Sequence, residues 1–249
     1  MTAHVAGLPG AADTTQMPTP NRCSATDGPP IRPGDPDPEK QSVRRRLLAA
    51  RRGRDPVRSS EENERLTALL HSTPELARLG RGSTVAGYSP LAGEPSPDAL
   101  LCALADAGVR VLLPVLRPDR DLDWRVAGPA VASERAGSDG GTLGLTAVTR
   151  ADVVLLPGVA GDRAGRRLGR GGGSYDRVLA RLAVGGTSPN AASQDAAGQG
   201  AVRPWTCLLV WPEELLARVP AQDHDRPVDA VATATGLVRA PSAGHRPPS

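Results

Sequence analysis

A glycine- and arginine-rich segment at residues 165–176 carries the strongest chemical signal in this sequence. Its glycines let the backbone approach an anion closely, and the start of the helix predicted after it offers N–H groups without intrahelical partners. Arg167 and Arg170 add positive charge of the kind that matches phosphate oxygens. The segment therefore predicts a nucleotide-binding site. The glycines in question are Gly169, Gly171, Gly172 and Gly173.

Two common nucleotide motifs do not describe this segment. It has no Gly-Lys-Ser/Thr, which a Walker A loop requires, and its glycines lack the later spacing of a Rossmann fingerprint. An RNA-binding Arg/Gly run is the other interpretation of such a composition. However, the segment lies between an apolar strand and a helix and ends in Tyr175 and Asp176, a polar pair that a disordered RNA-binding tail does not need. We therefore favour a small-molecule site.

Lys40 is the only lysine in the sequence, although the chain has 30 cationic residues. A helix is predicted over residues 38–52, with Asp37 as N-cap, a proline at the first helical position and a stop at Gly53. Within this helix Lys40 and Arg44 are four residues apart and lie on one stripe. Two cations therefore point the same way, which indicates a second contribution to anion binding.

Short apolar strands alternate with helices through most of the chain. A second helix is predicted over about residues 60–70, and a third opens at Ser96 and ends at Gly108 between two of the strands. This repetition predicts an α/β fold, a doubly wound, mostly parallel sheet with helices on both faces. Such sheets bind ligands beyond the carboxyl ends of their strands, so the site is expected there. The strand candidates are residues 84–88, 109–115, 153–157, 206–211 and 228–232.

Both ends of the chain and one internal stretch have compositions that bury little apolar surface. The sequence predicts a flexible N-terminal arm at residues 1–36, a flexible insertion at residues 185–202 and a disordered tail at residues 240–249. These segments surround or interrupt one α/β domain at residues 37–239. No internal repeat of solenoid or propeller length is present.

The overall composition excludes several classes of protein. The chain has 249 residues, of which 39% are hydrophobic, and no run of about 18 apolar residues, so no membrane partner is expected. Its 30 cationic and 27 anionic side chains are nearly balanced, so nucleic acid is not implied as a partner. Three widely spaced cysteines argue against a disulfide framework, and residues 1–30 lack the features of a secretory signal. A cytoplasmic monomer is expected.

The segment at residues 165–176 resembles the signature of 5-formyltetrahydrofolate cyclo-ligases, also called methenyltetrahydrofolate synthetases, which reads Gly-x-Arg-Leu-Gly-x-Gly-x-Gly-Tyr-Tyr-Asp. Other motifs agree in order along the chain. Lys40 and Arg44 resemble the family's N-terminal Lys-x-x-x-Arg, and a strand and loop resemble those ending in its substrate-contacting glutamate, here Glu94. The resemblance covers about residues 38–239. The remaining matches are the strands ending at Pro114 and Pro157 and the closing motif at residues 219–233.

This resemblance implies a fold similar to that of sugar-phosphate isomerases and CoA transferases, and an ATP- and Mg²⁺-dependent ring closure. ATP would phosphorylate the formyl oxygen on N5 of 5-formyltetrahydrofolate, N10 would attack the activated carbon, and phosphate would leave to give 5,10-methenyltetrahydrofolate. Phosphoryl transfer depends mostly on positioning and charge neutralisation. Cations, backbone N–H groups and a metal suit this task better than a nucleophile does.

The resemblance also implies roles for individual residues. Asp176 and Asp225 would bind Mg²⁺, a hard cation that takes carboxylate and phosphate oxygens. The alternatives are a carboxylate at a helix start for Asp176 and a turn with a local hydrogen bond for Asp225. Glu94 would accept hydrogen bonds from the pterin, with Tyr88 and Ser89 as walls of the same pocket. The catalytic residues would be Lys40, Arg170 and Tyr175, and the ATP-binding residues Lys40, Arg44, Arg167, Leu168, Gly169, Arg170, Gly171, Gly172, Gly173, Ser174 and Tyr175.

The sequence departs from the family pattern at two positions. Ser174 stands where an aromatic residue usually precedes the tyrosine, and Gly161 stands where phenylalanine commonly precedes an aspartate. Stacking on the folate would change at both positions. Two alternatives to the cyclo-ligase therefore stay open, a divergent nucleotide-binding member of the family without folate activity and an Arg/Gly-rich RNA-binding protein, whose binding would weaken steeply with salt.

Overall fold

The computed structural model describes residues 1–2, 37–128, 141–185, 203–222 and 225–241. The chain divides into two compact units, Met1–Asp35 and Pro36–Ser249, and the fold below is that of the second unit. Most of the predicted arm, insertion and tail lies outside the described residues. The described helices include none with the length and hydropathy that crossing a bilayer requires.

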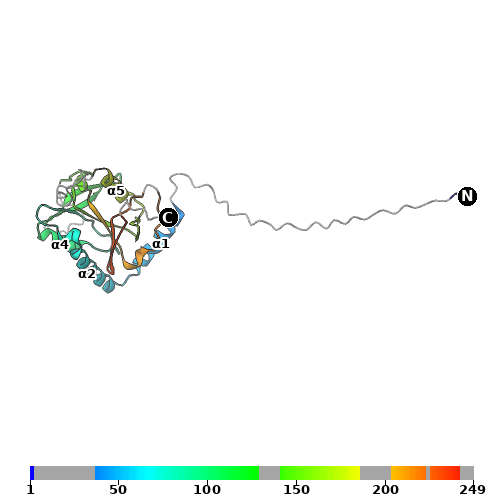
Figure 1. Ribbon diagram of the computed structural model, residues 1–249, viewed down its shortest axis with the longest axis horizontal. Helices are drawn as coiled ribbons and strands as arrows, with labels where there is room; N and C mark the ends of the chain where they lie inside the picture. The colour runs from blue at the N-terminus through cyan, green and yellow to red at the C-terminus, as the bar shows by residue number, and fades with distance from the viewer. Residues whose placement is uncertain (3–36, 129–140, 186–202, 223–224, 242–249) are drawn as a thin grey trace. The chain divides into compact units, whose positions relative to one another are not determined.

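A seven-stranded sheet forms the centre of the second unit (Figure 1). Its strands lie in the order β10-β9-β7-β4-β1-β2-β3. The five inner strands run parallel, and β3 and β10 pair antiparallel at the two edges. The predicted mostly parallel α/β sheet is therefore confirmed. The strands are β1 Thr84–Ala86, β2 Arg110–Leu116, β3 Leu122–Val126, β4 Val153–Pro157, β7 Trp205–Leu209, β9 Ala230–Thr233 and β10 Gly236–Arg239.

The inner strands are buried on both faces, which explains why they are continuous apolar runs. Side chains alternate between the two faces of a strand. In β4, Leu155 joins one hydrophobic cluster and Leu156 the other, and Cys207 and Leu208 of β7 divide in the same way. Two cores thus sandwich one sheet.

Helices cover both faces of the sheet, as the sequence predicts. One face packs against α2 (Pro56–Ser72), α3 (Pro74–Ala77) and α4 (Asp98–Asp106), and the other packs against α5 (Ser174–Gly185) and the short helix η1 (Ala147–Arg150). Figure 1 shows α5 on the side away from α2 and α4. Helix α2 begins four residues before the predicted residue 60, because the side chain of Asp55 accepts a hydrogen bond from Val57 N–H and caps an earlier turn.

Helix α1 (Pro38–Arg52) has the bounds that the sequence predicts, with the Asp37 carboxylate accepting the N–H groups of Glu39 and Lys40. Its apolar side packs on a second, three-stranded sheet, where Leu47 meets Leu168 in a third cluster. The strands of this sheet are β5 Ala160–Asp162, β6 Arg167–Leu168 and β8 Leu215–Leu216. Because β6 leads directly into the glycines at residues 169–173, this packing brings α1 beside those glycines.

The strands that the sequence did not predict are the edge and accessory strands. β3 and β10 are antiparallel partners of β2 and β9, and their mixed polar and apolar residues give no continuous apolar run. β5, β6 and β8 have two or three residues each, too few for a periodic pattern. The strand predicted to reach Tyr88 ends at Ala86, after which the chain turns into the loop that carries Glu94.

The order of the sheet reverses between β1 and β4. From β1 the chain continues outward through β2 to β3, and from β4 it continues outward in the other direction through β7 to β9. Open α/β sheets bind ligands in the crevice outside the carboxyl ends of the strands at such a point. The topology therefore selects the ends of β1 and β4 as the place for a site.

Candidate functional site

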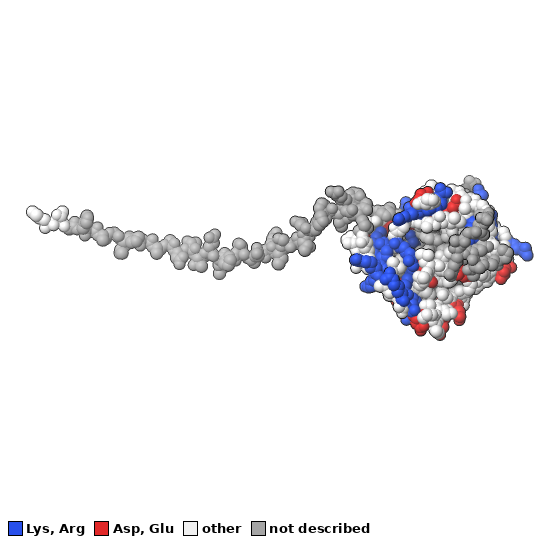
Figure 2. Space-filling view, turned by 180° about the vertical axis from the view of Figure 1, so that it is seen from behind, with Lys and Arg blue, Asp and Glu red and all other residues white. Residues whose placement is uncertain are grey.

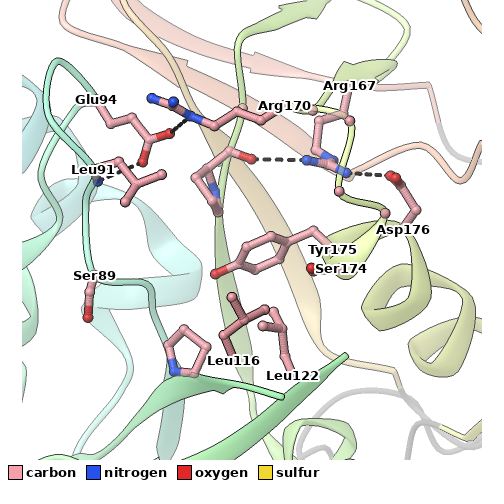
Figure 3. A pocket seen from close by; sticks show the side chains of 17 residues that line it. Ser89, Leu91, Glu94, Leu116, Leu122, Arg167, Arg170, Ser174, Tyr175 and Asp176 are labelled. Carbon is pink, nitrogen blue, oxygen red and sulfur yellow. Dashed lines mark hydrogen bonds and ion pairs between the residues drawn. The ribbon is translucent and has the colours of Figure 1, made fainter. Parts of the chain in front are cut away.

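A cavity of about 300 Å³ lies at that point of the sheet (Figure 3). Its walls come from the ends of β1, β2 and β4, from the start of β3, and from the glycine-rich segment that leads into α5. The cavity thus joins chain segments that are up to 87 residues apart in the sequence, from Ser89 to Asp176. The lining residues are Ser89, Leu91, Glu94, Pro114, Leu116, Leu122, Pro157, Gly158, Arg167, Gly169, Arg170, Gly171, Gly172, Gly173, Ser174, Tyr175 and Asp176.

The glycine-rich loop, residues 169–173, forms one wall of the cavity between β6 and α5. Gly171 and Gly173 have φ angles of 98° and 72°, a region that favours glycine. Arg44 on α1 holds the loop, because its Nε donates to the carbonyl oxygen of Gly169 at 2.8 Å. A Cβ on Gly171 would lie 3.6 Å from the Arg44 guanidinium carbon. The loop therefore has a fixed, left-handed backbone beside a cation.

Arg167 lies beneath the loop with only 4% of its side chain exposed. Its guanidinium donates to the carbonyl oxygen of Pro157 at 3.2 Å and pairs with Asp176 at the start of α5. Its Nε has no hydrogen-bond partner among the described residues. The guanidinium also lies 5.9 Å from the ring centre of Tyr175, within range of a cation–π contact. Arg167 thus fastens the end of β4 to the start of α5.

Arg170 and Glu94 meet across the mouth of the cavity (Figure 3). Arg170 Nε donates to Glu94 Oε1 at 2.8 Å, and Leu91 N–H donates to Glu94 Oε2 at 3.0 Å. The Glu94 side chain is 4% exposed, whereas that of Arg170 is 38% exposed. A cation expected to bind ATP and a carboxylate expected to bind folate are therefore partners of each other in this structure.

Lys40 pairs with Asp225 one helical turn away from the loop contact of Arg44. The Lys40 Nζ lies 2.6 Å from Asp225 Oδ2, which also accepts the N–H of Gln222 at 2.7 Å. Neither Lys40 nor Asp225 is among the residues that line the cavity, and Leu168 is buried next to it without lining it. The predicted α1 stripe thus places Arg44 against the loop and Lys40 against the segment that follows β8.

The two tyrosines occupy different positions. Tyr88 is 1% exposed, its hydroxyl donates to the Pro95 carbonyl oxygen at 2.6 Å, and it packs in the core instead of lining the cavity. The side chain of Tyr175 extends into the cavity above Leu116 and Leu122 in Figure 3. Burial, reinforced by the negative charge of Glu94, raises the pKa of Tyr175 well above its usual value, although Arg167 opposes the shift. Its hydroxyl is therefore a neutral donor at physiological pH.

Ser174 connects the loop to the hairpin formed by β2 and β3. Its hydroxyl donates to the carbonyl oxygen of Arg120 at 2.6 Å, and Arg177 donates to the same oxygen. Leu116 and Leu122, which flank this hairpin turn, line the cavity. The serine found where the family pattern has an aromatic residue thus anchors one wall of the cavity.

Gly161, the second position that departs from the family pattern, lies in β5. A Cβ there would lie 2.7 Å from a methyl carbon of the buried Leu208 side chain, so a larger residue would require that side chain to shift.

Asp176 has the properties that a magnesium ligand beside the loop would need. It lines the cavity, its side chain is 48% exposed, and Arg167 engages only one of its two oxygens. Three or more His, Cys, Asp or Glu side chains do not converge anywhere in the described residues. Magnesium bound beside phosphates typically takes only one or two carboxylates from the protein. Asp176 fits that pattern, whereas the Oδ2 of Asp225 already serves Lys40 and Gln222.

Arg51 and Glu214 are two buried charged residues near the cavity that the sequence patterns did not single out. Arg51 Nε and Nη2 bind Glu214 Oε1 and Oε2 at 2.6 and 2.8 Å. Burial raises the pKa of Glu214, while the bonds from Arg51 oppose the shift. Helical spacing could have identified Arg51 from the sequence, because Arg44, Leu47 and Arg51 fall on one face of α1.

Positive charge gathers on one side of the domain in Figure 2, where Lys and Arg side chains form a continuous area. Helix α1 carries three exposed arginines, Arg45, Arg46 and Arg52. Such a field attracts anionic ligands over a distance of about 8 Å at physiological salt. It suits substrates that carry phosphate or carboxylate groups.

Comparisons with known proteins show which family this chain is similar to. A family model for the 5-formyltetrahydrofolate cyclo-ligase family matches residues 36–234. A 5-formyltetrahydrofolate cyclo-ligase of Mycolicibacterium smegmatis is 37% identical over 185 residues, which are 64% of this chain and 86% of the relative. A protein of the same name from Escherichia coli K12 is 27% identical over 190 residues, 74% of this chain and 93% of the relative.

Two solved structures share the fold. A 5,10-methenyltetrahydrofolate synthetase from Aquifex aeolicus has a TM-score of 0.61 and 22% identity, covering 84% of this chain and 96% of that one. The corresponding protein from Mycoplasma pneumoniae has a TM-score of 0.57 and 18% identity, covering 79% of this chain and 99% of that one. The α/β architecture described above is therefore an established one.

Proposed function

Because the chain belongs to the 5-formyltetrahydrofolate cyclo-ligase family, we propose that it converts 5-formyltetrahydrofolate to 5,10-methenyltetrahydrofolate with ATP as co-substrate. The observation that carries this proposal is the pair formed by Arg170 and Glu94. It joins the glycine-rich loop, which suits phosphates, to a buried carboxylate that suits the N–H groups of a pterin. Two substrates that must react with each other need adjacent subsites, and this pair lies where such subsites would meet.

The phosphate subsite of the proposal is the glycine-rich loop with the cations around it. Backbone N–H groups at the start of α5 and the left-handed turns at Gly171 and Gly173 suit phosphate oxygens. Arg170 is exposed enough to turn toward a phosphate, and Arg44 keeps the loop against α1. Lys40 would supply charge near the same phosphates, with Asp225 orienting its ammonium group. The other predicted positions in the loop and in the flanking β6 and α5, namely Arg167, Leu168, Gly169, Gly172, Ser174 and Tyr175, would complete the ATP subsite.

The folate subsite of the proposal lies on the other side of that pair. Glu94 would accept hydrogen bonds from the pterin, with Ser89 as a neighbouring wall. Leu116 and Leu122 offer an apolar surface of the kind that flat rings pack against. Tyr88, buried with its hydroxyl bonded to Pro95, would support this subsite from beneath without touching the substrate.

Asp176 would hold Mg²⁺ together with the phosphates of ATP. A magnesium ion at this place supplies charge neutralisation for the transferred phosphoryl group. Arg167 would hold the Asp176 carboxylate at the start of α5 both with and without the metal. Asp225, which is also expected from the sequence to bind Mg²⁺, would instead orient Lys40, because its Oδ2 pairs with Lys40 and accepts the Gln222 N–H.

The chemistry of the proposal needs placement and charge more than a protein nucleophile. The formyl oxygen attacks the γ-phosphorus of ATP, and ADP leaves. N10 then attacks the activated formyl carbon, and the C–O bond to phosphate breaks with loss of the N10 proton. Arg170 and Lys40 would stabilise the negative charge on the transferred group. Tyr175, which stays protonated, would donate a hydrogen bond to an oxygen in the cavity.

The test is an absorbance assay with the purified full-length chain, MgATP and 5-formyltetrahydrofolate. The proposal predicts a rise in the near-ultraviolet absorbance of the methenyl product that requires ATP and Mg²⁺. Asp176→Ala should abolish the rise while the far-ultraviolet circular dichroism stays unchanged. A flat trace from folded wild-type protein would overturn the proposal. The expected monomer in the cytoplasm belongs to the same proposal, and light scattering on this sample tests the monomer.

A further inference from the structure

Arg51 is a buried arginine at the end of α1 and has no role in the phosphoryl transfer proposed above. The residue is only 5% exposed. A charge in such a place requires partners, because an isolated buried ion is costly. Its partners lie on the segments that follow three central strands of the main sheet, namely Glu94 after β1, Gly158 after β4 and Glu214 after β7.

The contacts of Arg51 leave one donor directed at Glu94. Its Nε and Nη2 bind the two oxygens of Glu214 at 2.6 and 2.8 Å, and Nη2 also donates to the Gly158 carbonyl oxygen. Its Nη1 lies 3.6 Å from Glu94 Oε1 and has no hydrogen-bond partner among the described residues. Glu214 thus fixes the plane of the guanidinium, and the remaining edge faces Glu94.

Glu94 therefore has two cationic neighbours of different kinds. Arg170 contacts Oε1 at 2.8 Å from a glycine-rich loop, with 38% of its side chain exposed. Arg51 contacts the same oxygen at 3.6 Å from a helix, with 3% of its side chain exposed. A phosphate in the loop would compete for Arg170, but it could not reach Arg51. Arg51 would then be the cation that remains beside the Glu94 carboxylate.

The loop that carries Glu94 rests directly on Arg51. Gly93 has a φ of 79°, and a Cβ at this position would lie 3.3 Å from the Cβ of Arg51. The carbonyl oxygen of Gly93 accepts the indole N–H of Trp211 at 2.9 Å, which also holds the loop in place. The position of the Glu94 backbone thus depends on the same helix that supplies the guanidinium.

We propose that Arg51 is a positioning residue for the folate-binding carboxylate. It holds Glu94 and compensates its charge while Arg170 engages ATP, and Glu214 aims its guanidinium. This inference rests on the proposed function, since it concerns the folate subsite of that reaction. Arg51 touches neither substrate, so its effect is transmitted through Glu94 alone.

Steady-state kinetics of the full-length Arg51→Lys variant tests the inference. A lysine lacks the fork that reaches Glu214 and Glu94 together. The KM for 5-formyltetrahydrofolate should rise about tenfold, because the Glu94 carboxylate loses the buried cation that compensates its charge, while the KM for ATP stays nearly constant. Adding Arg51→Lys to Glu94→Gln should raise the folate KM little further, because the pathway through Glu94 is already removed.

Arg54→Lys is the matched control. Arg54 is also an inward-facing arginine near the end of α1, but it pairs with Glu62 and Glu213 and stacks on Trp211 without contacting Glu94. It should raise the folate KM far less than Arg51→Lys does, because Arg54 reaches the Glu94 loop only indirectly, through Trp211 and the Gly93 carbonyl oxygen. Equal increases in the KM for both substrates, or additive effects of Arg51→Lys and Glu94→Gln, would overturn the inference.

A second variant separates positioning from a merely structural role. Arg51→Met combined with Glu214→Leu removes both members of the buried pair, a change that often leaves stability intact or improves it. If Arg51 only stabilises the fold, this variant should restore a normal folate KM. The inference predicts a folded protein whose folate KM remains raised. Absence of turnover in the wild type would instead count against the proposed function, so the two failures are distinguishable.

Discussion

The end of β5 and the start of α5 each carry an aspartate paired with an arginine, but the two carboxylates differ in how many hydrogen-bond donors they accept. Asp162 is 1% exposed and accepts the N–H groups of Ala164, Arg166 and Val219 as well as the Arg166 side chain. Asp176 is half-exposed and pairs with Arg167.

This difference separates a structural ion pair from one that a ligand can use. The four donors on Asp162 leave no capacity for a ligand, and they fix the turn that leads into β6. The carboxylate of Asp176 keeps one oxygen available at the edge of the cavity. The pairs Lys40–Asp225 and Arg170–Glu94 belong with the Asp176 pair, because each contains at least one group that we propose to act on a substrate.

The largest expected effect is on the structural side of this comparison. Asp162→Ala should lower the free energy of unfolding by about 3 kcal/mol, because it leaves buried N–H groups and Arg166 without their acceptor. Denaturant unfolding followed by circular dichroism measures this change. Asp176→Ala, measured in parallel, should lower stability by a smaller amount, about 1–2 kcal/mol, because its carboxylate is half-exposed although its partner Arg167 is buried. Equal losses for the two variants would contradict the distinction.

On the ligand side, Lys40→Met should reduce turnover about 100-fold, the size expected when one charge that stabilises a transition state is removed. Its unfolding free energy should change by only about 1 kcal/mol, since the pair with Asp225 is partly exposed. Arg45→Met, an exposed position on the same helix, is the control and should retain activity. A fully active Lys40→Met enzyme would remove Lys40 from the proposed ATP subsite.

Within the glycine-rich loop, Gly171→Ala and Gly172→Ala should differ. Gly171 has a φ of 98°, so alanine there costs about 1 kcal/mol of backbone strain. Gly172 lacks a positive φ, and the nearest atom to an added Cβ is the Ser174 hydroxyl oxygen at 3.8 Å. The KM for ATP should rise several-fold more for Gly171→Ala. Indistinguishable KM values would show that the left-handed turn is not needed for phosphate binding.

The smallest effect concerns pH and another structural carboxylate, Asp229. Burial opposes its ionisation, but hydrogen bonds from Arg203 and Thr206 outweigh burial and hold the pKa of Asp229 below its usual value. Its contribution to stability is therefore present at neutral pH and is lost as the pH falls below about 4. The stability difference between wild type and Asp229→Asn, from urea unfolding at several pH values, should shrink on acidification. A difference independent of pH would contradict this assignment.

Local signals explain what could be predicted from the sequence. The bounds of α1 follow from its Asp37 cap and Gly53 stop, and the inner strands follow from apolar runs that both cores bury. The glycine-rich loop was identifiable because its glycines and arginines are contiguous. Of the two cations predicted on one stripe of α1, Arg44 contacts the loop, whereas Lys40 pairs with Asp225.

The rest depended on contacts between distant segments. Arg51 and Glu214 are 163 residues apart, and no local pattern marks either as buried. The pairing of Arg170 with Glu94 also required the fold, since the sequence indicates separately that one suits phosphate and the other suits a pterin. For Tyr88 the sequence predicts a contact that the structure does not show. Its position after β1 predicts a wall of the cavity, whereas its ring packs in the core.

The most direct test of the central claim is to measure methenyl product and inorganic phosphate in the same reaction of the full-length chain. If the cavity joins an ATP subsite to a folate subsite, the two products should form in equal amounts. Neither product should form when ATP or 5-formyltetrahydrofolate is left out. Phosphate released without methenyl product, at a rate that 5-formyltetrahydrofolate does not change, would contradict the account.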